Sequence, residues 1–188
     1  MSNDTSDTQR RALLQMAAGL AAAGSLGMDT AHAAAIKPVA NGKPGDFYFL
    51  TGEWKIKNRR LKDKTWDTFD GEATVTSILG GLVSIEELRI PARNFSGMGL
   101  RLLDVERKLW ADYWVNSKSG LLTPPPSWGS FVDGVATWDS DDTDDNQPII
   151  VRGVWDRITS NSCRWYQAMS RDDGKTWAES WVMDWKRV

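Results

Sequence analysis

The sequence predicts an all-β fold, a single antiparallel up-and-down β-barrel of nine to ten strands. After Phe47 the chain consists of short runs in which apolar and polar residues alternate, and turn residues separate the runs. This part of the chain has no convincing helical period, apart from one turn at 46–50. Consecutive hairpins favour a closed barrel, because closure removes exposed strand edges.

Nine runs are predicted as strands. They cover residues 54–61, 66–79, 82–90, 95–104, 109–116, 130–138, 149–158, 163–170 and 177–187. Residues 139–147 contain five aspartates and are predicted as a solvated hairpin tip, with a calcium-binding loop as the alternative. The connection 117–130 is long for a hairpin and holds three consecutive prolines. It either caps the barrel mouth or packs on the outer wall.

Residues 1–33 have the features of an export signal. The pair Arg10-Arg11 precedes the apolar stretch 12–26, and an A-x-A cleavage site follows at 31–33. The arginine pair followed by three apolar residues is similar to the core of a twin-arginine signal. A retained membrane anchor is the alternative, but the apolar stretch is shorter than the ~20 residues that a spanning helix needs.

These features divide the chain into an export signal (1–33), a linker rich in Ala, Pro and Gly (34–45) and a barrel domain (46–188). We expect cleavage near Ala33, a periplasmic or secreted location, and no membrane association after cleavage. Cleavage also removes His32, the one histidine of the sequence.

Composition excludes several classes of function. The formal net charge of -2 argues against a nucleic-acid-binding protein. Cys163 is the one cysteine, so an intramolecular disulfide and a multi-cysteine metal site are excluded. Without His32 the exported domain has no imidazole for a Ser-His-Asp triad or for a histidine-ligated metal. We therefore expect neither a metal site nor a cofactor.

Five sequence segments occur in order along the barrel domain. They are F-L-x-G-E-W-x-x-x-N-R-R-L at 49–61, L-G-G-L at 79–82, G-M-x-L-R-L-x-D at 97–104, R-W-x-Q-A-x-S-x-D-x-G-x-T-W at 164–177 and W-x-M-D at 181–184. Together they resemble an uncharacterised bacterial family of lipocalin-like, or calycin, barrels known only as a domain of unknown function. The resemblance implies the fold and no particular activity.

Two residues are expected to close the barrel. Gly52-Glu53-Trp54 resembles the G-x-W motif of the calycin barrels, in which the tryptophan closes one end against a basic residue late in the chain. The resemblance implies this structural role for Trp54 and for Arg187 or Lys186. The segment 170–177 fits an Asp-box, which we interpret as a stable hairpin turn, because one such box in a chain of this length cannot make a propeller.

The first hypothesis for function is a barrel that binds a small apolar or aromatic ligand. Eleven tryptophans are spread over almost every predicted strand, too many for core filling alone, and some are expected to line a cavity or a homodimer contact. Polar residues within the predicted strands would orient the ligand. Beyond the candidates named next, this polar set includes Glu86, Asp112, Asn116 and Glu179. The candidate ligand-binding residues are Asn58, Arg60, Glu87, Arg101, Trp114, Arg152, Gln167 and Trp181.

Two alternatives stay open. A histidine-free isomerase, lyase or hydratase would use Glu or Asp as acid and base with Arg as an electrostatic clamp, and Glu87 with Arg101 is the expected pair. A structural or dimerisation module would have a barrel filled by side chains. The expected partners are a small molecule or a second copy of the chain, and not nucleic acid.

Overall fold

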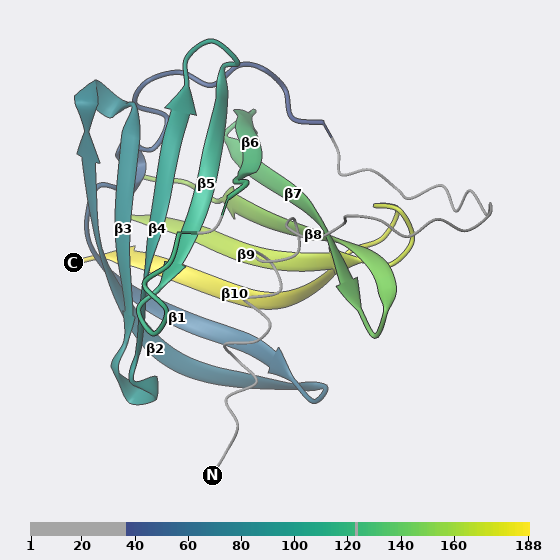
Figure 1. Ribbon diagram of the computed structural model, residues 1–188. Helices are drawn as coiled ribbons and strands as arrows, with labels where there is room; N and C mark the ends of the chain where they lie inside the picture. Colours follow the sequence, from purple (N-terminus) through teal and green to yellow (C-terminus); the bar gives the residue numbers. More distant parts are fainter. Residues whose placement is uncertain (1–36, 123) are drawn as a thin grey trace, which may run out of the picture.

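A computed structural model describes residues 37–122 and 124–188, which form one closed barrel of ten antiparallel strands (Figure 1). Consecutive strands pair with each other, and β1 closes the ring on β10. The predicted fold class, an all-β up-and-down barrel, is confirmed. The predicted export signal, residues 1–33, lies outside the described residues.

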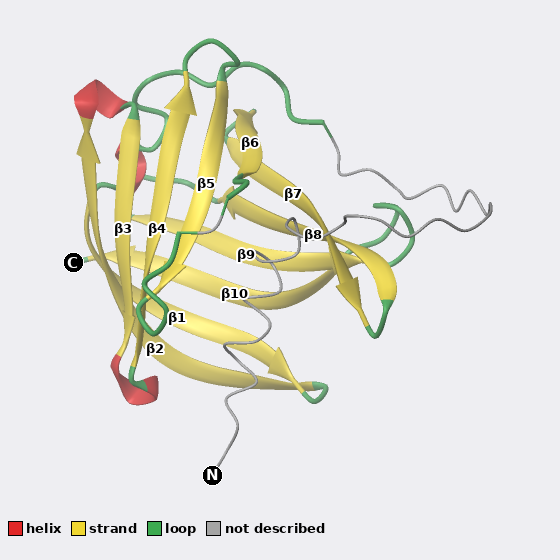
Figure 2. Cartoon of the chain, in the orientation of Figure 1, coloured by secondary structure: helices red, strands yellow, loops and turns green. Residues whose placement is uncertain are grey.

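The strands are β1 (Gly52–Lys62), β2 (Thr65–Ile78), β3 (Val83–Ile90), β4 (Phe95–Asp104), β5 (Leu109–Asn116), β6 (Ser127–Val132), β7 (Val135–Asp144), β8 (Gln147–Asp156), β9 (Ser162–Ser170) and β10 (Ala178–Arg187). Helical structure in the part described is confined to the 3-10 turns η1 (Tyr48–Leu50), η2 (Leu79–Gly81) and η3 (Pro91–Arg93), drawn red in Figure 2. No helix of residues 37–122 and 124–188 is long and apolar enough to cross a bilayer.

The predicted strand 130–138 is in fact parts of two strands. β6 ends at Val132 and β7 begins at Val135. Asp133 and Gly134 form the turn between them, with φ values of 50° and 78°. Two-residue hairpin turns favour Asp-Gly because both positions require positive φ. This Asp-Gly dipeptide indicates in the sequence that the run 130–138 divides into two strands.

The aspartate-rich segment 139–147 is also mostly strand rather than hairpin tip. β7 continues to Asp144, and the turn consists of Asp145 and Asn146. The alternation of β7 turns Asp142 into the barrel and Asp139 outward. Among the residues described, no group of three His, Cys, Asp or Glu side chains is arranged to hold a metal ion.

Alternation along each strand decides which side chains fill the barrel. On β1, Trp54, Ile56 and Asn58 are buried, while the lysines between them are exposed. On β4 the inner face carries Gly97, Gly99, Arg101 and Leu103, and the apolar residues between them face outward.

Inward glycines make room for tryptophan rings. A Cβ atom on Gly97 would lie 2.2 Å from the ring of Trp114, and one on Gly129 would lie 2.5 Å from the ring of Trp138. The inward tryptophans are Trp54, Trp110, Trp114, Trp138, Trp155, Trp165, Trp181 and Trp185. Trp66, Trp128 and Trp177 lie outside, each under a guanidinium group, of Arg59, Arg107 and Arg152 respectively. Most of the tryptophans therefore point into the barrel.

One end of the barrel is closed by the chain that precedes β1. Phe47 and Leu50 in and beside η1 are 2% and 0% exposed, so this segment forms a plug. The ring of Phe47 packs edge-on against Trp110 with a centroid distance of 4.8 Å. The end of the predicted linker also contacts the barrel, because the N–H groups of Gly42 and Gly45 donate to backbone carbonyls of β-strand connections.

Arg187, at the end of β10, fastens this plug. Its guanidinium lies 4.2 Å from the ring centre of Trp54. It donates hydrogen bonds to the backbone carbonyls of Thr51, Phe49 and Ser160 at 2.6, 2.7 and 2.8 Å. The indole N–H of Trp54 donates to the carbonyl of Leu50 at 2.7 Å. The polar groups of the closed end are thus hydrogen-bonded to one another.

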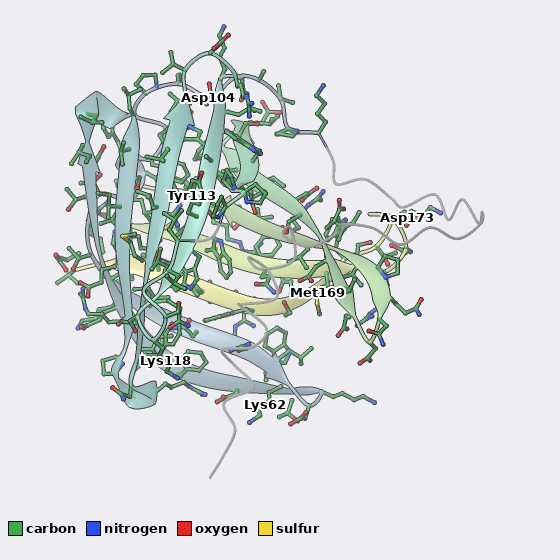
Figure 3. The ribbon with its side chains drawn as sticks, in the orientation of Figure 1. Lys62, Asp104, Tyr113, Lys118, Met169 and Asp173 are labelled. Carbon is green, nitrogen blue, oxygen red and sulfur yellow. The ribbon has the colours of Figure 1, made fainter. Side chains whose placement is uncertain are left out.

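The opposite end carries the β1–β2, β7–β8 and β9–β10 turns. Figure 3 labels Asp104 near the closed end and Lys62 and Lys118 at the opposite end. The wall is incomplete here, because the short strand β6 pairs with β5 only over Trp110–Asp112. In the connection from β5 to β6, Leu121 and Leu122 are 69% and 45% exposed, so neither of these two side chains packs into the barrel mouth.

Candidate functional site

A cavity of about 100 Å³ lies inside the barrel. Tryptophans from five strands form much of its wall, and they are Trp114, Trp138, Trp155, Trp165 and Trp185. Gly153 on β8 contributes no side chain, and the nearest atoms that a Cβ atom there would meet belong to the Trp165 ring, at 3.6 Å or more. An apolar cavity of about 150 Å³ is enough to bind benzene. The space inside the barrel is about two thirds of that volume, which limits a ligand to the size of a single ring.

The cavity reaches the wall where β6 stops. Tyr113 and Trp114 of β5, Ser127 at the start of β6 and Ser140 of β7 are among its lining residues. In Figure 3 the side chain of Tyr113 marks this part of β5. The gap in strand pairing between β5 and β7 therefore coincides with one side of the cavity.

A cluster of charged residues forms the polar part of the wall. Arg101 on β4 donates from Nη2 to Oε2 of Glu86 at 2.7 Å, and its Nε lies 3.5 Å from Oδ1 of Asp112. The side chains of Arg101 and Glu86 are only 6% and 4% exposed. The guanidinium also lies 5.2 Å from the ring centre of Phe47 and 5.3 Å from that of Trp155. Arg101 thus stands between the plug and the cavity.

Burial disfavours the charged form of Arg101, but the carboxylates of Glu86 and Asp112 outweigh it and raise the pKa of the guanidinium. The arginine is therefore a permanent cation inside the barrel. Removing either partner of such a buried pair leaves an uncompensated charge, which is strongly destabilising.

Among the buried donors of residues that line the cavity, Nη1 of Arg101 and Nε1 of Trp185 have no hydrogen-bond acceptor in the part of the chain described. Both atoms are buried. A buried donor without an acceptor costs about 1–3 kcal/mol, so such groups are uncommon in folded proteins. These donors distinguish the cavity from the closed end, where Arg187 and Trp54 donate to carbonyls.

A second hollow, of about 210 Å³, lies at the open end. It is lined by the β1–β2 and β7–β8 hairpins and by Trp181, and it shares Val151 and Gln167 with the inner cavity. Asp142 faces this hollow, and burial raises the pKa of its carboxyl, with the charge of Asp144 acting in the same direction. Because they share these lining residues, the outer hollow lies next to the inner cavity.

Several predicted site residues line these spaces. Arg101, Trp114 and Gln167 line the inner cavity, and Arg60, Gln167 and Trp181 line the outer hollow. The guanidinium of Arg60 lies 4.9 Å from the ring centre of Trp181. Asn58 is fully buried and accepts a hydrogen bond from Nε1 of Trp181 at 3.0 Å, which fixes that ring.

Two other predicted site residues lie on the outer wall. Arg152 makes a bidentate contact with Asp139, both distances 2.7 Å, and its guanidinium lies 3.9 Å from the ring centre of Trp177. Glu87 is 61% exposed and pairs with Arg89 at 2.8 Å. Neither lines the inner cavity or the outer hollow.

The partner of Arg101 is Glu86 rather than Glu87, which corrects the pairing expected from the sequence. The register of β3 and β4 places Glu86 opposite Gly99 and turns Glu87 outward beside Met98. Gly99 leaves the space for the ion pair, since a Cβ atom there would lie 3.1 Å from Nη2 of Arg101. Gly99 and Gly97, two and four residues before Arg101, indicate in the sequence that this face of β4 points into the barrel.

Cys163 also points into the barrel from β9, near the closed end. It is 4% exposed, and burial, with the nearby charge of Glu86, raises the pKa of its thiol to about 12. A thiol with such a pKa is not a nucleophile near neutral pH. The cysteine is a packing residue.

A scan against protein-family models finds no match, and no curated protein matches the sequence. Among solved structures, a protein of unknown function from the DUF3598 family of Nostoc punctiforme aligns with a TM-score of 0.43 and 15% identity. The alignment covers 81% of this chain and 52% of that one, so this chain spans about half the length of the Nostoc protein. Rv2717c from Mycobacterium tuberculosis aligns with a TM-score of 0.48 and 12% identity over 79% of this chain and 99% of its own.

Similarity at this level carries no information about function. The chain is a β-barrel with a solved structural neighbour that is itself of unknown function. The resemblance to one uncharacterised calycin family stays a prediction.

Proposed function

We propose that this protein binds a small apolar or aromatic molecule inside its barrel. The observation that supports the proposal is the cavity of about 100 Å³ whose wall contains five tryptophans. Transfer of apolar surface from water into such a space contributes roughly 25 cal/mol per Å². Binding sites for small molecules are typically concave and largely apolar, with a few polar groups that fix orientation.

The proposal includes export, with the barrel acting in the periplasm or outside the cell. It rests on the arginine pair, the apolar stretch and the cleavage site within residues 1–33. The test is fractionation of cells that express the full chain and the Arg10→Lys/Arg11→Lys variant. The processed protein should occur in the periplasmic or secreted fraction, and the variant should accumulate unprocessed in the cytoplasm. An unprocessed native chain in the cytoplasm would contradict export.

Ligand binding is tested by calorimetric titration with ethylbenzene. We expect saturable binding to the native protein with a negative heat-capacity change. Gly153→Ala should weaken binding by about threefold or more, because the added methyl group projects into the cavity. It should leave the melting temperature nearly unchanged, because a Cβ atom at this position makes only an ordinary contact, 3.6 Å from Trp165.

The absence of saturable binding, or equal affinities of the two proteins, would contradict a ligand site in this cavity. Native mass spectrometry of protein purified from its own host then identifies the mass of a retained ligand.

A further inference from the structure

We propose that the ligand carries a neutral hydrogen-bond acceptor, such as the carbonyl oxygen of an aryl ketone or a quinone, and that Arg101 and Trp185 donate to it. This inference rests on the proposed ligand binding and adds the chemical class of the ligand. It concerns two donors of the cavity wall, Nη1 of Arg101 and Nε1 of Trp185.

The need for an acceptor follows from the hydrogen bonds of the wall. Arg101 presents several N–H groups, of which Nη2 is used by Glu86. Nη1 of the same guanidinium is buried and donates to no described residue. Nε1 of Trp185 is likewise buried and donates to no described residue. Both side chains line the cavity. A ligand that supplies acceptors removes the cost of these buried donors, whereas a pure hydrocarbon leaves it in place.

The charge of the cluster favours a neutral acceptor over an anion. One guanidinium faces two carboxylates, those of Glu86 and Asp112, at 2.7 and 3.5 Å. A third negative charge would be repelled by both carboxylates, and it would also lose its hydration on entering an aromatic cavity. The arginine is already paired, so it acts toward a ligand as a hydrogen-bond donor rather than as a free positive charge.

A cationic ligand is disfavoured by the same atoms. Tryptophan rings and a net negative cluster attract cations in general. In this cavity, however, the guanidinium itself lies against Trp155, at 5.3 Å from the ring centre. The buried groups that lack partners in the wall include two donors, which a cationic N–H group cannot satisfy. A flat ring with a carbonyl group fits the walls and the donors together.

The experiment compares four single-ring probes by calorimetry: acetophenone, ethylbenzene, benzoate and benzylammonium. Ethylbenzene has nearly the shape of acetophenone but no acceptor. Ethylbenzene is more hydrophobic than acetophenone, which alone favours its binding to an apolar site. The readout is therefore the ratio of the Kd of ethylbenzene to the Kd of acetophenone, compared between the native protein and its variants. Benzoate and benzylammonium are expected to bind more weakly than acetophenone.

The variant that removes the ion pair is Glu86→Leu/Arg101→Met. It exchanges a buried pair for apolar side chains, a change that is often neutral for folding, and it leaves the net charge of the cluster unchanged. We expect the affinity for acetophenone to fall relative to that for ethylbenzene, so that the Kd ratio changes by about tenfold or more in favour of ethylbenzene. The reason is the loss of a hydrogen bond from a charged donor.

The matched control is Asp139→Leu/Arg152→Met, which removes an equally close ion pair from the outer wall. The Kd ratio should not change in this variant. Trp185→Phe removes one N–H donor and keeps a ring, so it tests the same inference if the first double variant does not fold. We expect it to shift the Kd ratio in the same direction by about threefold or more.

A Kd ratio that is unchanged in both cavity variants would overturn the inference and leave the proposed function intact, because ethylbenzene would still bind. Tightest binding of benzoate or benzylammonium would overturn the neutral class. If none of the probes bound the native protein, the proposed function itself would fail, and this inference with it.

Discussion

The two ends of the barrel each hold an arginine over a tryptophan, Arg187 over Trp54 and Arg60 over Trp181, at 4.2 and 4.9 Å. At the closed end Arg187 also donates to three backbone carbonyls, and the chain before β1 fills the remaining space. At the open end the corresponding pair lines a hollow. The same kind of contact therefore takes part in closure at one end and borders a hollow at the other.

The largest expected effect separates two tryptophans. Trp54→Ala should lower the free energy of unfolding by about 3–5 kcal/mol, because a fully buried ring and its hydrogen bond to Leu50 are lost. Trp165→Ala, in the cavity wall, should cost about 1–2 kcal/mol, because its half-buried ring borders empty space. Urea unfolding measures both, and equal losses would contradict the distinction between closed end and cavity.

The two arginines give the next largest difference. Arg187→Met should cost about 2–3 kcal/mol, since it removes hydrogen bonds to the carbonyls of Phe49, Thr51 and Ser160 as well as the contact with Trp54. Arg60→Met should cost less, about 1 kcal/mol, because its contact with the Trp181 ring lies at the accessible open end. A larger loss for Arg60 than for Arg187, in the same unfolding experiment, would reverse the comparison.

Two inward glycines distinguish the tight packing around Trp114 from the open part of the cavity wall at Gly153. Gly97→Ala should destabilise the protein by about 1–3 kcal/mol, because its methyl group would lie within 2.2 Å of the Trp114 ring. Gly153→Ala should change stability by less than about 1 kcal/mol, and in the stabilising direction, because the unfolded chain loses freedom. Thermal melts of both variants check this, and equal effects would show that the wall is uniformly packed.

The smallest effect concerns the turn between β9 and β10. Hydrogen bonds from the hydroxyl and N–H of Thr176 and from Ser170 lower the pKa of Asp172 from 3.8 to about 2. A lowered pKa stabilises the fold above the unfolded pKa, and this contribution is lost as the pH falls toward 2. Asp172→Asn should therefore reduce the melting temperature slightly at pH 6, and the difference should shrink between pH 4 and pH 2. A difference that is independent of pH would contradict the role of the carboxylate.

The order of strands was predictable because alternation survives in most of them. On β1 the lysines alternate with Trp54, Ile56 and Asn58, so the inner face can be assigned from the sequence. The observed ten strands lie within the predicted nine to ten, but the run 130–138 is not one strand, because the turn Asp133-Gly134 divides it between β6 and β7. The aspartates of β7 favour a loop by composition alone, because aspartate is depleted in strands.

The site was less predictable because several strands have apolar residues on both faces. On β4, Met98 and Leu100 face outward while Gly99 and Arg101 line the cavity, the opposite of what hydrophobicity alone indicates. The choice between Glu86 and Glu87 depends on the same assignment. The residues that line the cavity come from all the strands from β3 to β10, and only closure of the barrel brings these strands together.

The short strand β6 leaves β7 with an open edge, and the acidic run of β7 lies on it. The pairing of β6 with β7 ends at Trp138, and in the part of the chain described no other strand continues along that side toward Asp144. Strand edges of this kind recruit strands of other molecules and begin aggregation, and charged side chains on the edge oppose it. On this edge Asp141 is exposed, so its charge opposes such pairing at the place where the barrel wall is least complete.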